Sequence, residues 1–130
     1  MKKIKLDKLQ LDVMQALWKK GEATVAEVQE FLKTEKDLAI TTIGTILSRL
    51  EKKNVVAHRV AGRKYIFRAL VSEKDTKRSM VSSLINELFQ GNSGSLVNHL
   101  LEESELDAQD LEKLKVLIEK SEQRKEEDCD

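Results

Sequence analysis

Apolar residues recur at spacings of three and four along the first part of the chain, a period that predicts amphipathic helices. A first helix is expected from about Lys8 to Lys20, and a shorter second one from Thr24 to about Lys33. A third follows the polar break TEKDLA. Its apolar face has the spacing of a single helical stripe and consists of Ile43, Ile46, Leu47 and Leu50.

The ends of these helices carry capping signals. Asp7 with Gln10, and Thr24 with Glu27, have the three-residue spacing of a capping box, in which each side chain bonds the backbone amide of the other residue. Asn54 is suited to the left-handed conformation that commonly ends a helix. These signals support the expected helix boundaries.

After Asn54 the pattern changes from a helical period to alternation. Two runs rich in β-branched and aromatic residues, VVAHRV at 55–60 and YIFRAL at 65–70, flank the short segment AGRK. Two such runs around a glycine-containing turn predict a β-hairpin. Its tip carries Arg63 and Lys64.

The second half of the chain returns to a helical period. Ser72 and Asp75 form a further capping signature, and the apolar stripe after them continues to Gly91. A last helix is expected from about Ala108. We therefore expect a mainly α protein with an N-terminal domain over residues 1–71, a helical domain over 72–124 and a polar tail over 125–130.

The net charge of zero conceals a division between the two halves. Residues 1–78 contain 18 Lys and Arg against 10 Asp and Glu, a net charge of +8; residues 79–130 contain 5 against 13, a net charge of −8. A basic part that binds a polyanion and an acidic part that does not would produce this division. Two solvated surfaces of opposite charge are the alternative, because charge alone does not define a site.

Composition excludes several classes of protein. Aromatic residues make up 4% of the chain, too few for a stacking platform for single-stranded nucleic acid. The single cysteine, Cys129, cannot form an internal disulfide or a four-ligand metal site. No nucleophile and base stand at usable spacing, so we expect no enzyme, no cofactor and no metal. No apolar run reaches the roughly 18 residues of a membrane span, so we expect a cytoplasmic protein.

Three short helices followed by a hairpin with a basic tip is the element order of a winged helix-turn-helix, whose third helix enters the major groove of DNA. That helix needs one apolar face for the scaffold and one slim polar face for the groove. Gly44 within it costs about 1 kcal/mol relative to alanine, which a close approach to DNA would explain. The residues expected to contact DNA are Thr41, Thr42, Thr45, Ser48, Arg49, Lys53, Arg63 and Lys64.

Two alternatives to this interpretation stay open. The threonine hydroxyls could cap a helix and face water without any ligand. A winged helix could also act as a protein-interaction module without sequence-specific DNA binding. The pattern favours a DNA-binding protein over both, because the polar helix face, the basic hairpin and the charge division occur together.

The acidic half has more apolar surface than its short helices can bury alone, which predicts a homodimer with interleaved helices. Folding back onto the N-terminal domain is the alternative. A dimer would present two third helices to a two-fold operator, about one DNA turn apart. The residues expected at the dimer interface are Leu84, Leu88, Leu96, Leu100, Leu111, Leu114, Leu117 and Ile118.

Four segments of the chain resemble the penicillinase repressor family, which includes the β-lactamase and methicillin-resistance repressors and the copper-responsive repressors. They are LDVMQALWKKGEATVAEVQEFL, TTIGTILSRLEKKNVV, HRVAGRKYIFRALVS and GSLVNHLLEESELDAQDLEKL. The resemblance covers nearly the whole chain. It implies a homodimeric repressor with an N-terminal winged helix, a C-terminal helical dimerisation domain and a palindromic operator over a promoter, often of resistance genes.

The chain departs from this family at positions that bear on recognition and induction. Thr41 and Gly44 stand where β-lactamase repressors have a Lys and an Arg, so the operator sequence stays open. The Asn-Phe bond at which proteolytically induced members are cut corresponds to His99-Leu100, so a sensor protease as partner stays open as well. The copper-responsive members end in a multi-cysteine motif, whereas this chain has Cys129 alone.

Overall fold

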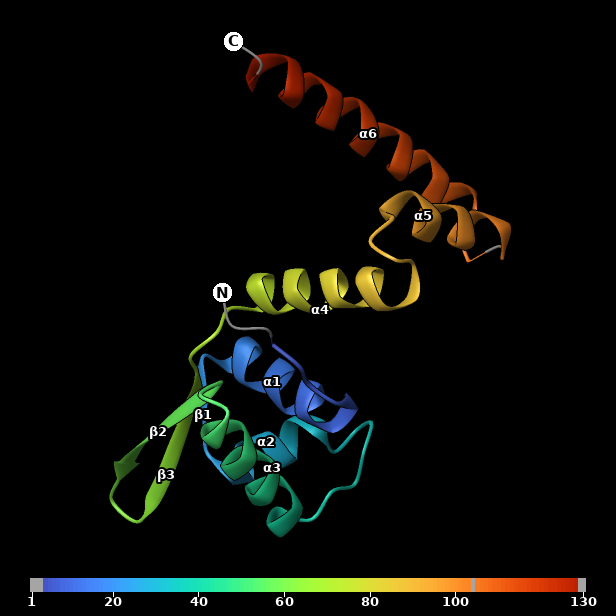
Figure 1. The fold of residues 1–130 in the computed structure, drawn as a ribbon. Coiled ribbons are helices and arrows are strands. Elements are labelled where there is room, and N and C mark those ends of the chain that lie inside the picture. Colours follow the sequence, from blue (N-terminus) through green and yellow to red (C-terminus); the bar gives the residue numbers. More distant parts are fainter. Residues whose placement is uncertain (1–3, 104, 129–130) are drawn as a thin grey trace. The chain divides into compact units, whose positions relative to one another are not determined.

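A computed structural model describes residues 4–103 and 105–128 of the chain, which divide into two compact units. The first unit ends at Ser83 and the second begins at Leu84. Figure 1 shows the order of the helices and strands along the chain. The first unit holds three helices and a small sheet, and the predicted mainly α fold class is confirmed.

The three predicted N-terminal helices are confirmed, with boundaries close to those expected. They are α1 (Lys8–Lys20), α2 (Val25–Leu32) and α3 (Ile40–Lys52). The Asp7 carboxylate accepts a hydrogen bond from the Gln10 amide at 2.8 Å, and the Thr24 hydroxyl accepts one from the Glu27 amide at 3.2 Å. The reciprocal bonds complete both capping boxes. Asn54 has a φ of 64° and ends α3 as predicted.

The predicted hairpin is also confirmed. Strands β2 (Val56–Ala61) and β3 (Lys64–Ala69) pair antiparallel, with Ala61 opposite Lys64 at the tip. Gly62 and Arg63 form the two-residue loop, and of these two it is Gly62 that has a positive φ, at 65°. This is the pattern of a type II′ turn, whose twist matches that of the flanking strands.

One strand has no counterpart in the sequence analysis. Strand β1 (Glu22–Ala23) pairs antiparallel with β3, giving the sheet order β1-β3-β2. Two residues are too few to show an alternating pattern. Because β1 runs directly into Thr24, the N-cap of α2, it ties the hairpin to the second helix.

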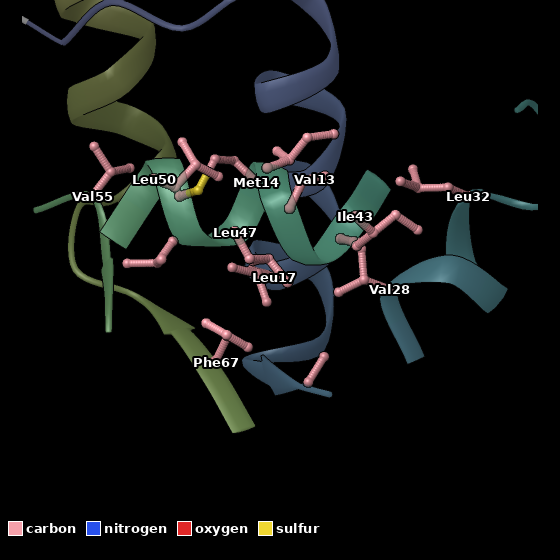
Figure 2. Close-up of a cluster of buried hydrophobic side chains, with 14 residues drawn as sticks. Val13, Met14, Leu17, Val28, Leu32, Ile43, Leu47, Leu50, Val55 and Phe67 are labelled. Atoms are coloured by element: carbon pink, nitrogen blue, oxygen red, sulfur yellow. The ribbon is translucent and has the colours of Figure 1, made fainter. Parts of the chain in front are cut away.

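The core of the first unit lies between the three helices and the sheet, as Figure 2 shows. Its buried side chains include Val13, Met14, Leu17, Val28, Leu32, Ile43, Leu47, Leu50, Val55 and Phe67. At its edge, the Trp18 indole donates from Nε1 to the Val71 carbonyl at 3.0 Å. Packing of α3 into this core leaves the opposite side of the helix facing outward.

The remaining helices are α4 (Glu73–Leu88), α5 (Ser93–Glu102) and α6 (Ala108–Asp128). The Ser72 hydroxyl accepts from the Asp75 amide at 3.0 Å, which confirms the predicted cap of α4. The Asn92 side chain caps α5 by accepting from the Ser95 amide at 3.2 Å. Helix α6 begins where the sequence predicts and continues into the stretch assigned to a polar tail.

The domain boundaries expected from the sequence stay predictions. The division between the two units falls at Ser83 and Leu84, inside α4, whereas the sequence predicts a boundary at residues 71–72. Cys129 lies outside the described residues. Among the helices that the structure describes, none combines the length and the apolar character needed to cross a membrane.

Candidate nucleic-acid interface

Helix α3 has two chemically distinct faces. Its apolar face, Ile43, Ile46, Leu47 and Leu50, is buried in the core of the first unit. The predicted contact residues on the other side are all exposed, namely Thr41, Thr42, Thr45, Ser48 and Arg49. The exposed side is therefore built mainly from short hydroxyl side chains, with Ile40 at its start and Arg49 and Lys52 toward its C-terminal end. Short side chains allow a helix to approach a flat or grooved surface closely.

One of these hydroxyl groups already has a partner within the helix. The Thr45 hydroxyl donates to the Thr41 carbonyl at 2.9 Å, the bond that threonine commonly makes to the preceding turn. Thr45 can still offer a ligand its methyl group and the acceptor capacity of its oxygen. The bond gives the Thr45 hydroxyl a structural role within the helix, and Thr45 is not its cap.

The start of α3 is suited to an anion. The N-cap residue is Ala39, whose side chain cannot accept a hydrogen bond, and the first intrahelical bond runs from Ile43 N to Ala39 O at 3.1 Å. The backbone amides ahead of that bond lack intrahelical acceptors. The first turn, all of it described, contains no acidic residue. Free amides and the positive end of the helix dipole favour a phosphate group here.

The loop between α2 and α3 is held in place by side chains of both preceding helices. Asp12 of α1 accepts a hydrogen bond from Lys36 Nζ at 2.7 Å and another from Lys8 Nζ at 3.0 Å. Gln29 of α2 donates from its side-chain amide to the Leu38 carbonyl at 2.9 Å. These bonds fix the segment that leads into α3. No local pattern in the sequence indicates these bonds, although Asp12 stands within the apolar stripe of the first helix.

Asp12 is a buried charge, with only 4% of its surface exposed. Burial on its own would raise the pKa of the Asp12 carboxyl. The hydrogen bonds and charges of Lys36 and Lys8 outweigh that effect and hold the pKa below its ordinary value of 3.8. Asp12 is therefore ionised at neutral pH and keeps both lysines as partners.

The hairpin presents cations of two kinds. Arg63 and Lys64 at the tip are exposed, as predicted for a wing that contacts phosphates. Arg59 instead pairs with Glu22 of β1, with its NH2 group 2.9 Å from Glu22 Oε1. This bond raises the pKa of Arg59 and lowers the pKa of Glu22. Arg59 thus carries less uncompensated charge than the residues at the tip.

A contact between α3 and the hairpin joins the two parts of the candidate surface. His58 Nδ1 of β2 lies 2.5 Å from Glu51 Oε2 near the end of α3. The His58 ring stacks on Tyr65 with a centroid distance of 4.4 Å and lies 5.5 Å from the ring of Phe67. His58 therefore packs along the hairpin. Its pairing with Glu51 has no signal in the sequence, because it depends on how the hairpin meets the helix.

Lys53 differs from the other predicted DNA contacts. Its Nζ donates to the Lys5 carbonyl at 3.1 Å and to Gln10 Oε1 at 3.0 Å. These bonds connect the end of α3 to the segment around the start of α1. They give Lys53 a role in the scaffold, and its contact with DNA stays a prediction.

The second unit leaves much apolar surface uncovered. Among the residues that the structure describes in α5 and α6, none is buried. Of the residues predicted at a dimer interface, Leu96, Leu100 and Leu114 are half-buried. The others are exposed: Leu84, Leu88, Leu111, Leu117 and Ile118. Leu117 has 60% of its surface exposed and Leu88 66%, which is unusual for leucine in a single folded chain.

The predicted cleavage position lies within a helix. His99 is exposed and Leu100 half-buried, both in α5. The His99 ring lies 6.0 Å from the ring of Phe89, within the same unit. A protease that binds an extended chain would therefore require local unwinding of α5. His99-Leu100 stays the position that corresponds to the cleaved bond of the proteolytically induced members, and induction by proteolysis stays open.

The fold and the surface together define a class of protein. Three helices packed around one core, the third with an exposed polar face, and a hairpin with a basic tip form a winged helix-turn-helix. The chain belongs to the penicillinase repressor family, whose sequence profile matches residues 6–120. Members of this family are transcriptional repressors and not enzymes, which agrees with the function class expected from the sequence.

Individual relatives agree with this assignment. The penicillinase repressor of Bacillus licheniformis is 30% identical over 128 residues, which cover 98% of this chain and 100% of that protein. The methicillin resistance regulatory protein MecI of Staphylococcus aureus (strain N315) is 28% identical over 109 residues, covering 84% of this chain and 89% of that protein. The solution structure of the DNA binding domain of the repressor BlaI is 30% identical. It covers 57% of this chain and 90% of that chain, with a TM-score of 0.51.

Proposed function

We propose that this chain is a homodimeric repressor that inserts α3 of each protomer into the major groove of a palindromic operator. The observation that carries this proposal is the division of α3 into a buried apolar face and an exposed face of short polar side chains. A helix needs both faces to dock on a scaffold and enter a groove. The similarity to a repressor's DNA binding domain supports the same function.

Each part of the surface has a distinct role in this proposal. Thr41, Thr42, Thr45 and Ser48 contact base edges, because hydroxyl groups can bond bases and threonine methyl groups can contact thymine. Arg49 and the exposed tip residues Arg63 and Lys64 contact phosphates, which position the protein without reading sequence. The free amides at the start of α3 bind a further phosphate.

The dimer forms through the second unit. Helices α5 and α6 have no buried residue among those described, yet carry exposed leucine, valine and isoleucine side chains. A second copy of the chain carries the same exposed apolar side chains. Packing the two copies around a two-fold axis would bury the apolar side chains of both. The two α3 helices would then meet half-sites about one DNA turn apart, which accounts for a palindromic operator.

The test uses the full-length chain and duplexes that it selects from a random pool of double-stranded DNA. Fluorescence anisotropy then compares Thr42→Ala with Thr34→Ala, because Thr34 is an exposed threonine outside α3. We expect Thr42→Ala to weaken binding to the selected duplex by roughly tenfold, as expected for loss of a base contact, and to leave binding to scrambled DNA unchanged. Thr34→Ala should match the wild type in both assays.

Two results would contradict the proposal. One is that the pool yields no enriched sequence, or that the enriched duplex is not palindromic. The other is that Thr42→Ala and Thr34→Ala bind the selected duplex equally well. Retained binding to a protein partner alongside either result would favour the protein-interaction module.

A further inference from the structure

Gly44 lies within helix α3, and neither its backbone angles nor its described contacts require a glycine there. Its backbone is helical and its φ is not in the left-handed region that favours glycine. Apart from its chain neighbours and its own helix backbone, no described heavy atom lies within 4 Å of the point where a Cβ would stand. Alanine would therefore fit, and alanine is the better helix former.

The residues around Gly44 make this position a gap in the candidate recognition face. Gly44 follows Thr41 by three residues, and it precedes Thr45 by one residue and Ser48 by four. With 3.6 residues per turn, all four lie on one side of the helix. All three neighbours are exposed, short and uncharged. The half-buried Gly44 leaves a shallow notch at the edge of this face, with the three short side chains on one side and the exposed Ile40, four residues earlier, on the other.

The chemistry around the notch is more apolar than its composition indicates. The Thr45 hydroxyl hydrogen is occupied by the Thr41 carbonyl at 2.9 Å, so donation to a base would require breaking that bond. The threonine methyl groups remain available. Neither Gly44 nor its three neighbours can make the bidentate bond by which arginine or lysine recognises guanine.

We propose that the notch at Gly44 receives the methyl group of a thymine in each operator half-site, and that Gly44 thereby determines specificity for an A·T pair. This inference rests on the proposed function, since it requires α3 to lie in the major groove. The thymine C5-methyl projects into that groove, and apolar contact with a threonine methyl group is one of the ways in which it is recognised. A Cβ at position 44 would occupy the space that the thymine methyl needs.

The experiment combines a variant of the protein with a variant of the DNA. Duplexes selected by the full-length wild type are resynthesised with uracil in place of each half-site thymine in turn, which removes the methyl group and keeps the base pair. At one position, uracil should weaken wild-type binding about fourfold, the effect expected for one buried methyl group. Gly44→Ala should weaken binding to the all-thymine duplex roughly tenfold. At the same position it should bind the uracil duplex more tightly than the thymine duplex.

Thermal unfolding separates this effect from damage to the fold. Because alanine favours the helix and meets no described side chain, Gly44→Ala should raise the melting temperature by about 4 °C while it weakens DNA binding. Gln15→Ala is the control, since Gln15 is an exposed helical residue of α1 in the first unit and alanine favours the helix there as well. It should keep the wild-type affinity and the wild-type response to uracil.

The outcomes distinguish this inference from the proposed function. If the wild type selects no duplex, the proposed function fails and the notch has no ligand. If it selects a duplex and Gly44→Ala binds that duplex as tightly as the wild type, the inference is wrong and the proposed function stands. The inference is equally wrong if Gly44→Ala binds the thymine duplex more tightly than the uracil duplex at every position where the wild type does. Reversal of the preference at one position supports it.

Discussion

At Asp12 the chain carries a carboxylate three residues after Leu9 and four before Ala16, inside the apolar stripe of α1. Such a position is a signal of a buried charge, and buried charges require partners. Which residue serves as the partner could not be predicted, because Lys36 lies 24 residues further along the chain. The bond between them joins α1 to the loop that leads into α3, so a residue outside α3 helps to position that helix.

Replacing Asp12 by asparagine should lower the free energy of unfolding by about 1–2 kcal/mol at pH 7, because Lys8 and Lys36 keep access to solvent after the pair is lost. The folded-state pKa of Asp12 is lowered, so its contribution is present above the unfolded value and is lost as the pH falls through the folded value. Urea unfolding from pH 7 to pH 2 measures the difference in the free energy of unfolding between the wild type and Asp12→Asn. This difference should become smaller below about pH 4.

Asp37 provides the control for this prediction, since it is an exposed aspartate in the same loop. Asp37→Asn should stay within about 0.5 kcal/mol of the wild type at pH 7, as is usual for surface substitutions. If the difference in the free energy of unfolding between the wild type and Asp12→Asn keeps the same size from pH 7 to pH 2, the lost interaction is not ionic.

Among the elements, those with local signals could be predicted from the sequence. Helices α1 to α3 have capping residues within three positions of their starts or stop residues at their ends, and the hairpin has alternating strands around a glycine. Strand β1 could not be predicted, because two residues carry no period and its pairing with β3 is a tertiary contact. The extent of α6 could not be predicted either, since its last turns contain only polar residues.

Helix α6 carries the prediction that tests the dimer. Leu117 has 60% of its surface exposed in the single chain, so Leu117→Asp should leave the fold of that chain intact. In a dimer the same change would bury a charge, which is costly. Sedimentation velocity should therefore show a dimer for the wild type and a monomer for Leu117→Asp, with unchanged helical content by circular dichroism.

Gln123→Asp is the matched control, because Gln123 is an exposed residue on another face of α6. It should remain dimeric. The assignment of this interface is wrong if Leu117→Asp sediments as the wild type does, or if both variants dissociate to the same extent.

At the scale of the whole molecule, the candidate surface could be predicted in its composition but not in its internal bonds. The exposed residues of α3 follow from the helical period once the apolar face is known. The roles of the cations do not follow from it. Lys53 is bound to the scaffold and Arg59 is paired with Glu22, although both stand beside residues that remain exposed. These bonds depend on segments that are distant in the sequence and meet only in the fold.

The division of charge between the halves acts at this scale as well. A segment with a net charge of +8 attracts DNA, and one with −8 would be repelled by it. In the proposed dimer, Arg49, Arg63 and Lys64 contribute three charged phosphate contacts per protomer and six in all, whereas the uncharged amides of α3 neutralise no phosphate. Release of the counterions from those phosphates makes affinity depend steeply on salt.

The most direct test of DNA binding by α3 and the wing is the affinity of the full-length chain for its selected duplex across a salt series. Six phosphate contacts predict that log K falls with log salt with a slope of about −5. Arg63→Ala removes two contacts per dimer and should make the slope shallower by about 2, whereas Arg124→Ala, at an exposed arginine of α6, should not change it. A slope near zero, or equal slopes for Arg63→Ala and Arg124→Ala, would contradict this account.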